Sequence, residues 1–166
     1  MKTKKLVFMA LLTAISLVVW VIEAQIPPPV PVPGVKLGLA NVVTLTALAL
    51  LGRKEALAVL LARVVLASLF AGSFSAILFS LAGGLLSWAV MAGTVGRLGE
   101  KLLWVTSVLG AIGHNAGQLG AALLVTKTPA ILAYGPALLC AAIVTGVFTG
   151  VIAQNLHRAL QGRIRL

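Results

Sequence analysis

The chain has 166 residues, of which 60% are hydrophobic and 10% are charged, and its mean hydropathy is +1.11. A soluble domain of this size needs more polar side chains to cover its surface, so the composition predicts an integral membrane protein. The net charge of +10 does not indicate a nucleic-acid-binding protein, because the basic residues form short clusters between apolar runs. The single cysteine has no partner for a disulfide within the chain.

The first apolar run, residues 6–22, follows three lysines and has the pattern of either a signal peptide or a first transmembrane helix. The residues after the run are a poor cleavage site and further apolar runs follow, so we expect an uncleaved helix that stays in the membrane. Residues 25–34 come next and contain five prolines. Proline removes backbone donors and holds the chain extended, so this segment is predicted to be a loop.

Five further apolar runs follow the loop, each near or somewhat below the ~20 residues that cross a bilayer. They occupy residues 35–51, 56–70, 74–91, 102–125 and 129–153. The runs are continuous and rich in Leu and Ala, without the alternation of a β-barrel. The sequence therefore predicts an all-α integral membrane protein, a bundle of six transmembrane helices. The third and fourth runs are separated by only three residues, which fits a tight hairpin, with a re-entrant pair as the alternative.

The distribution of basic residues predicts the orientation, because cytoplasmic loops retain Lys and Arg. Six spans put both termini on one side of the membrane. With that side cytoplasmic, it collects most of the basic residues, and the outer loops contain only Lys36 and Lys127. We therefore expect cytoplasmic termini, a location in the cell membrane, and a basic tail at residues 154–166 that lies along the inner surface.

The acidic residues argue against an enzyme. The chain contains no aspartate, and its three glutamates fall near the ends of predicted spans. Diphosphate chemistry normally needs carboxylates that hold Mg²⁺, and a P-loop needs a GxxxxGK[ST] run, which is absent from the sequence. We therefore expect no catalytic residue, no metal site and no cofactor.

The fifth run reads VLGAIGHNAGQLGAALLV and combines glycines with polar residues. The glycines at positions 110, 113, 117 and 120 share a face on which a neighbouring helix can pack closely. His114, Asn115 and Gln118 form a separate polar strip beside that face. Because polar groups at mid-membrane avoid lipid, the strip is expected to line a ligand pocket. The alternative is that these side chains only form hydrogen bonds between helices and lock the bundle.

Lys36 and Asn41 are expected at a similar depth, in the outer half of the second span. The simplest arrangement is a pocket that opens to the outside beneath the proline-rich loop, with Lys36 attracting an anionic group. A lysine that only extends to the interface is the alternative. Tyr134, in the outer part of the sixth span, is a further candidate for the border of the pocket. Arg63 is expected either to extend to the cytoplasmic headgroups or to take a substrate or gating role.

The block PGVKLGLANVVTLTALALLG at residues 33–52, the six short spans and the AxxxA pair Ala10 and Ala14 together resemble the S components of energy-coupling-factor vitamin transporters. The resemblance covers nearly the whole chain. Within that group it points to the Gx transporter family, the branch labelled heptaprenyl diphosphate synthase component I. In such S components a small molecule binds near the outer face, beneath the loop after the first helix.

The resemblance also implies partners. The AxxxA helix of an S component meets a membrane coupling (T) subunit, which two cytoplasmic ATPases drive. Carried over, Ala10 and Ala14 contact the coupling subunit, residues 27–34 form the lid, and the polar strip lines the pocket.

Three functions follow from these observations. The first is a non-catalytic substrate-binding subunit of an uptake transporter for a small molecule, such as a vitamin or an isoprenoid or quinone-related precursor. The second is a non-catalytic membrane partner of a prenyl diphosphate synthase or a quinone-related system. The third is a stand-alone secondary carrier in which His114 is the proton-sensitive group.

Overall fold

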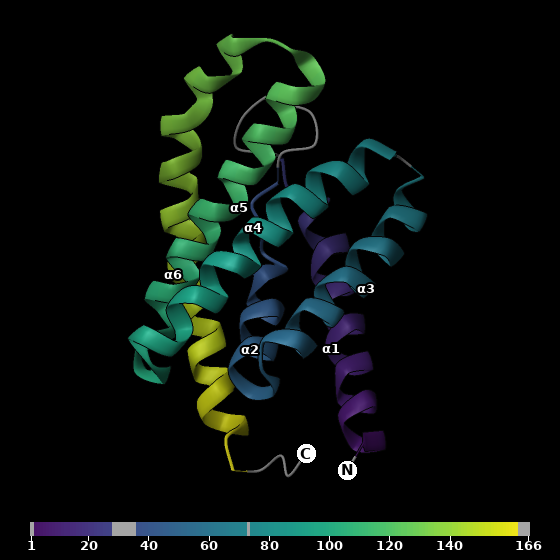
Figure 1. Cartoon of the computed structure of the whole chain (residues 1–166), viewed down its shortest axis with the longest axis vertical. Coiled ribbons are helices and arrows are strands. Elements are labelled where there is room, and N and C mark those ends of the chain that lie inside the picture. Colours follow the sequence, from purple (N-terminus) through teal and green to yellow (C-terminus); the bar gives the residue numbers. More distant parts are fainter. Residues whose placement is uncertain (1, 28–35, 73, 163–166) are drawn as a thin grey trace.

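The computed structural model describes residues 2–27, 36–72 and 74–162, and within these ranges the chain is helical without a strand (Figure 1). The six α-helices are α1 (Lys2–Glu23), α2 (Asn41–Leu51), α3 (Arg53–Ala71), α4 (Phe74–Leu98), α5 (Leu103–Thr126) and α6 (Gly135–Leu160). Two short 3₁₀ helices, η1 (Glu100–Leu102) and η2 (Pro129–Tyr134), lead into α5 and α6. The prediction of an all-α fold is confirmed.

Four helical segments are long and apolar enough to cross a membrane: Thr3–Glu23, Ile77–Leu98, Glu100–Thr126 and Pro129–Leu160. They indicate a multi-pass membrane protein. The helix α3 is not among them, because charged residues lie in its first turn and at Arg63. With 11 residues, α2 is also too short, since a helix rises 1.5 Å per residue and the hydrocarbon core is ~30 Å thick. Six crossings and cytoplasmic termini stay predictions.

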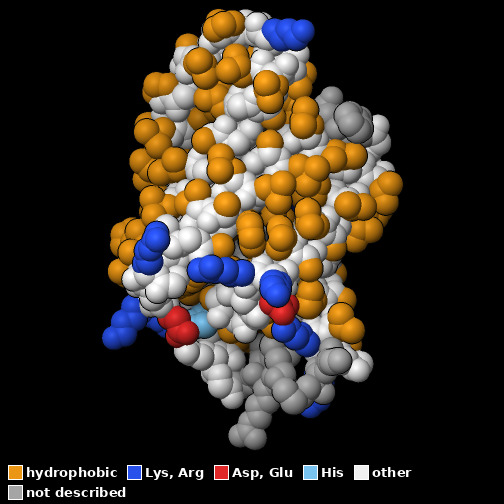
Figure 2. Space-filling view, viewed as in Figure 1, with side chains coloured by type: hydrophobic (Ala, Val, Ile, Leu, Met, Phe, Trp, Pro, Cys, Tyr) orange, Lys and Arg blue, Asp and Glu red, His pale blue; other side chains and the backbone are white. Residues whose placement is uncertain are grey.

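Many of the exposed charged side chains lie at the end of the molecule where α1 begins and α6 ends. Figure 1 shows the first residues of α1 and the last residues of α6 at this end. On the face seen in Figure 2, most Lys and Arg side chains gather towards that end, next to a broad belt of hydrophobic side chains. This is the distribution expected of a basic interface beside the hydrocarbon of a bilayer.

The helix α2 begins at Asn41 rather than at residue 35, where the second apolar run begins. Gly38 has a φ of 79°, in the left-handed region that glycine adopts without strain. The N–H of Asn41 donates to the carbonyl of Gly38 at 3.0 Å, so the chain makes a turn before the helix starts. We call residues 36–40 the entry turn. Residues 28–35, most of the predicted lid loop at 25–34, lie outside the described residues.

Glycine lets α5 pack closely against both of its neighbours. A Cβ atom added to Gly117 of α5 would lie 2.3 Å from the carbonyl oxygen of Ala82 in α4. One added to Gly150 of α6 would lie 2.5 Å from the Cα of Trp104 in α5. Gly120 faces open space instead. The predicted packing face therefore includes Gly110, Gly113 and Gly117 but not Gly120.

The contact at Gly117 predicts a difference between two substitutions in one helix. Gly117→Ala forces α4 and α5 apart, and we expect it to destabilise the protein by roughly 1–3 kcal/mol. Gly120→Ala adds a methyl group where nothing lies within 4 Å, and should leave stability unchanged. The melting temperatures of the purified variants in detergent test this, and equal values for the two variants would contradict the packing.

Candidate functional site

Five polar side chains are buried together inside the apolar bundle. Each is at most 6% exposed. They are Glu23 at the end of α1, Asn41 at the start of α2, Arg63 of α3, and His114 and Gln118 of α5. We call them the polar cluster. Arg63 and His114 lie near the middle of their helices.

The entry turn links the polar cluster through its backbone. The N–H of Gly38 donates to a carboxylate oxygen of Glu23, and the N–H of Lys36 donates to the amide oxygen of Gln118 at 3.0 Å. A buried carboxylate is costly unless it accepts hydrogen bonds, and a buried backbone N–H is costly unless it donates one. The two bonds therefore stabilise both partners and tie the end of α1 to the middle of α5.

Three glycines leave the room that the larger side chains occupy. A Cβ at Gly38 would lie 2.8 Å from Cδ2 of His114, and one at Gly83 of α4 would lie 2.9 Å from Nδ1 of the same ring. A Cβ at the next residue, Gly84, would lie 3.6 Å from Nη2 of Arg63. The imidazole is thus held between the entry turn and α4, and the guanidinium extends from α3 towards the same part of α4.

Arg63 does not extend to the headgroups, and that expectation from the sequence is wrong. Its side chain is 4% exposed. Glu23 is near enough for the two charges to attract, although no direct ion pair joins them in the described part of the chain. The Nε and Nη2 atoms of Arg63 have no hydrogen-bond partner among the described residues. From the sequence, a substrate or gating role for Arg63 was one of two alternatives, and Glu23 was not predicted for the site. Arg63 could have been recognised because it interrupts an apolar run.

Three of the residues predicted for the site, Asn41, His114 and Gln118, come together in the cluster. Lys36 takes part through its backbone, as described above. Its ammonium lies 4.2 Å from the centroid of the Trp20 ring, a cation–π contact. The lysine therefore packs beside the cluster and does not extend freely to the interface.

Asn115 and Tyr134, which were also predicted for the site, lie elsewhere. The Nδ2 of Asn115 donates to the carbonyl of Leu138 in α6 at 2.8 Å. Successive helical residues are rotated by about 100°, so Asn115 faces α6 while His114 faces α4. The polar strip of α5 thus divides between a helix-to-helix contact and the cluster. Tyr134 ends η2 and is 36% exposed, outside the buried cluster.

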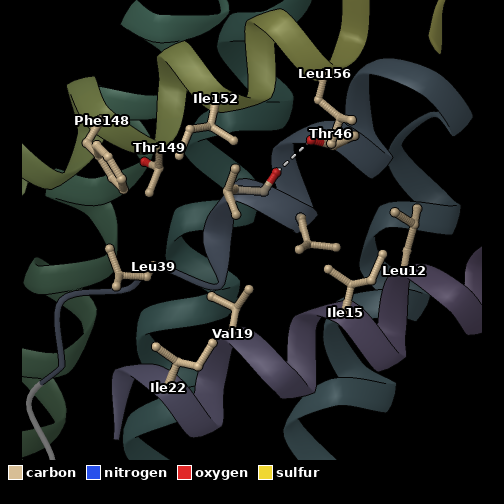
Figure 3. Close-up of a pocket in the computed structure, with 12 residues that line it drawn as sticks. Leu12, Ile15, Val19, Ile22, Leu39, Thr46, Phe148, Thr149, Ile152 and Leu156 are labelled. Carbon is tan, nitrogen blue, oxygen red and sulfur yellow. Dashed lines mark hydrogen bonds between the residues drawn. The ribbon is translucent and has the colours of Figure 1, made fainter. Parts of the chain in front are cut away.

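A separate apolar cavity of about 320 Å³ lies between α1, α2 and α6 (Figure 3). Its lining includes Leu12, Ile15, Val19, Ile22, Leu39, Phe148 and Ile152. The hydroxyls of its two threonines are satisfied within their own helices, that of Thr46 by the carbonyl of Val42 at 2.8 Å and that of Thr149 by the carbonyl of Thr145 at 2.7 Å. This cavity suits hydrocarbon, whereas the polar cluster suits a polar group.

The pair Ala10 and Ala14 is exposed on α1, on the side of the helix opposite the buried Leu12 and Ser16. The pair is therefore free of contacts that would compete with a partner helix. The described residues contain no group of three or more His, Cys, Asp or Glu side chains that could hold a metal ion.

The comparison with protein families finds a match. A family model described as heptaprenyl diphosphate synthase component I matches residues 12–156. The matched range begins in α1, ends in α6 and contains the whole polar cluster. The comparisons with curated proteins and with solved structures find no match.

The burial of Glu23 predicts that it matters for stability more than a surface glutamate does. Glu23→Ala leaves the N–H of Gly38 without an acceptor and Arg63 without a nearby negative charge, and we expect a loss of roughly 1–3 kcal/mol. Glu55→Ala is the control, because Glu55 only pairs with Lys5 at the surface. Thermal unfolding in detergent should show a much lower melting temperature for Glu23→Ala. A similar shift in both variants would argue against the buried contacts.

Proposed function

The chain belongs to the heptaprenyl diphosphate synthase component I family, and from this premise we propose that it is a non-catalytic membrane subunit that captures a small molecule for an energy-coupling-factor type uptake transporter. The polar cluster is the observation that carries the proposal. Hydrogen bonding in the cluster is incomplete, since donors of Arg63 and Asn41 have no partner among the described residues. Buried polar side chains normally have hydrogen-bond partners, so partnerless donors grouped in one cluster suit a bound polar molecule that completes them.

The proposed arrangement is a bundle in the cell membrane with six crossings and both termini in the cytoplasm. The basic end of the molecule, where α1 begins and α6 ends, supports this orientation (Figures 1 and 2). The cargo then arrives from the outside and binds at the polar cluster. Candidate cargoes are a vitamin or an isoprenoid or quinone-related precursor.

The proposed partners are a membrane coupling subunit and two cytoplasmic ATPases. The exposed Ala10 and Ala14 support the coupling contact, because two small residues four positions apart let a partner helix approach closely. In this scheme ligand binding selects one conformation of the subunit, and ATP hydrolysis in the partner supplies the work of reorientation.

A second candidate function is a non-catalytic membrane partner of a prenyl diphosphate synthase. The family description favours it, since it names one component of a synthase. The apolar cavity between α1, α2 and α6 is compatible with it, because its lining suits a hydrocarbon chain. The two candidates differ in the partner protein that each requires.

Substitution of the alanine pair distinguishes these functions. We expect Ala10→Leu with Ala14→Leu to abolish co-purification of ATPase subunits from the native host, because the bulky side chains hold a partner helix away. Small molecules retained by the purified protein, measured by mass spectrometry, should be unchanged.

Ala137→Leu, at an exposed alanine of α6, is the matched control and should keep the partners. Equal loss of partners and of the retained molecule in the alanine-pair variant would count against a coupling role for α1. Co-purification of a soluble prenyl synthase in place of ATPases would favour the second function.

A further inference from the structure

We propose that the ligand carries a carboxylate or phosphate group, and that Arg63 and Asn41 donate hydrogen bonds to it. The inference rests on the proposed function, because it names the chemical class of the molecule that the polar cluster captures. It follows from three properties of the cluster: which donors are free, which acceptors are occupied, and the balance of charge.

The free hydrogen-bonding atoms are mainly donors. Nε and Nη2 of Arg63 and Nδ2 of Asn41 are buried, and each lacks a partner among the described residues. An arginine nitrogen and an amide nitrogen can only donate. A group that satisfies this set must therefore bring acceptor oxygens.

The acceptor oxygens of the cluster already have hydrogen-bond donors from the protein. Glu23 accepts from the N–H of Gly38, and Gln118 accepts from the N–H of Lys36. The oxygens of these two side chains are not among the buried atoms that lack a partner in the described part of the chain. The atoms that still lack partners in Arg63 and Asn41 are therefore donors.

The balance of charge favours an anion as well. The charges of Lys36 and Arg63 both interact with the carboxylate of Glu23, which is the acidic group of the cluster. The buried Arg63 and the half-buried Lys36 are two cations near one carboxylate, which leaves an excess of one positive charge. Arginine binds carboxylate and phosphate through paired N–H donors, and these charge-assisted bonds are stronger than neutral ones.

The test uses the full chain in neutral detergent, with Trp88→Phe and Trp104→Phe so that Trp20 is the remaining tryptophan of the three. Trp20 contacts Lys36 beside the cluster, so its fluorescence should report binding.

The probe is a small-molecule extract of the native host, split by anion exchange into a retained and an unretained fraction. We expect the retained fraction to change the fluorescence and the unretained fraction to have no effect. Treatment of the retained fraction with phosphatase then distinguishes the two anionic groups. It should abolish the fluorescence change if the ligand is a phosphate ester and leave the change intact if the ligand is a carboxylate.

Two substitutions connect the response to the named residues. Arg63→Met should weaken the apparent affinity for the active fraction by at least about tenfold, since it removes hydrogen bonds from a charged donor. Arg97→Met, at an exposed arginine at the end of α4, is the matched control and should bind as the parent does. If Arg63→Met does not fold, Asn41→Ala is a second variant that tests the same site without a change of charge. It should also weaken binding.

The outcomes separate this inference from the proposed function. The proposal of an anionic ligand is overturned if the unretained fraction binds, or if Arg63→Met and Asn41→Ala both keep the affinity of the parent. This holds even if ATPases still co-purify. Binding of the anionic fraction without any ATPase partner supports the inference and overturns the transporter assignment. If neither fraction binds, both are overturned.

Discussion

The structure depends on the two backbone hydrogen bonds that the entry turn makes inside the bundle, from Gly38 to Glu23 and from Lys36 to Gln118. In hydrocarbon, each unpaired backbone N–H costs several kcal/mol, so non-helical backbone is tolerated only where protein groups satisfy it. These bonds provide that satisfaction. They let the chain reach the depth of the polar cluster without being helical, and for that reason α2 is short and begins only at Asn41.

The glycines of the bundle have two different roles, which depend on what faces them. Gly117 and Gly150 bring helix backbones together, and nothing larger fits between the chains there. Gly83 and Gly84 of α4 instead leave room for the side chains of His114 and Arg63. Close packing between α4 and α5 and the space for the polar cluster thus occur along the same helix pair. The cluster is held by rigid elements, as a binding site requires.

Much of the helical architecture could be predicted from the sequence, because a bilayer forces a continuous apolar run to be helical. The start of α2 could not, since it depends on contacts between residues far apart in the chain. His114 and Gln118 stood out as polar residues within an apolar run. Glu23 did not, because it ends its run at a place where a carboxylate normally meets water. The division between His114 and Asn115 depends on which helix each one faces, and periodicity alone does not reveal that.

The helix α1 physically connects the polar cluster to the surface proposed for the coupling subunit. Glu23 at its end takes part in the cluster, and Ala10 and Ala14 are exposed on its outer side. Ala14 and Glu23 are separated by about 14 Å along the axis, at 1.5 Å per residue. The anionic ligand that we propose for Arg63 would bring a second negative charge near Glu23, and repulsion between the two would weaken the attraction that draws the end of α1 towards α3. Because a helix moves as a nearly rigid rod, the proposed ligand would thereby alter how α1 presents its alanine pair to the proposed partner.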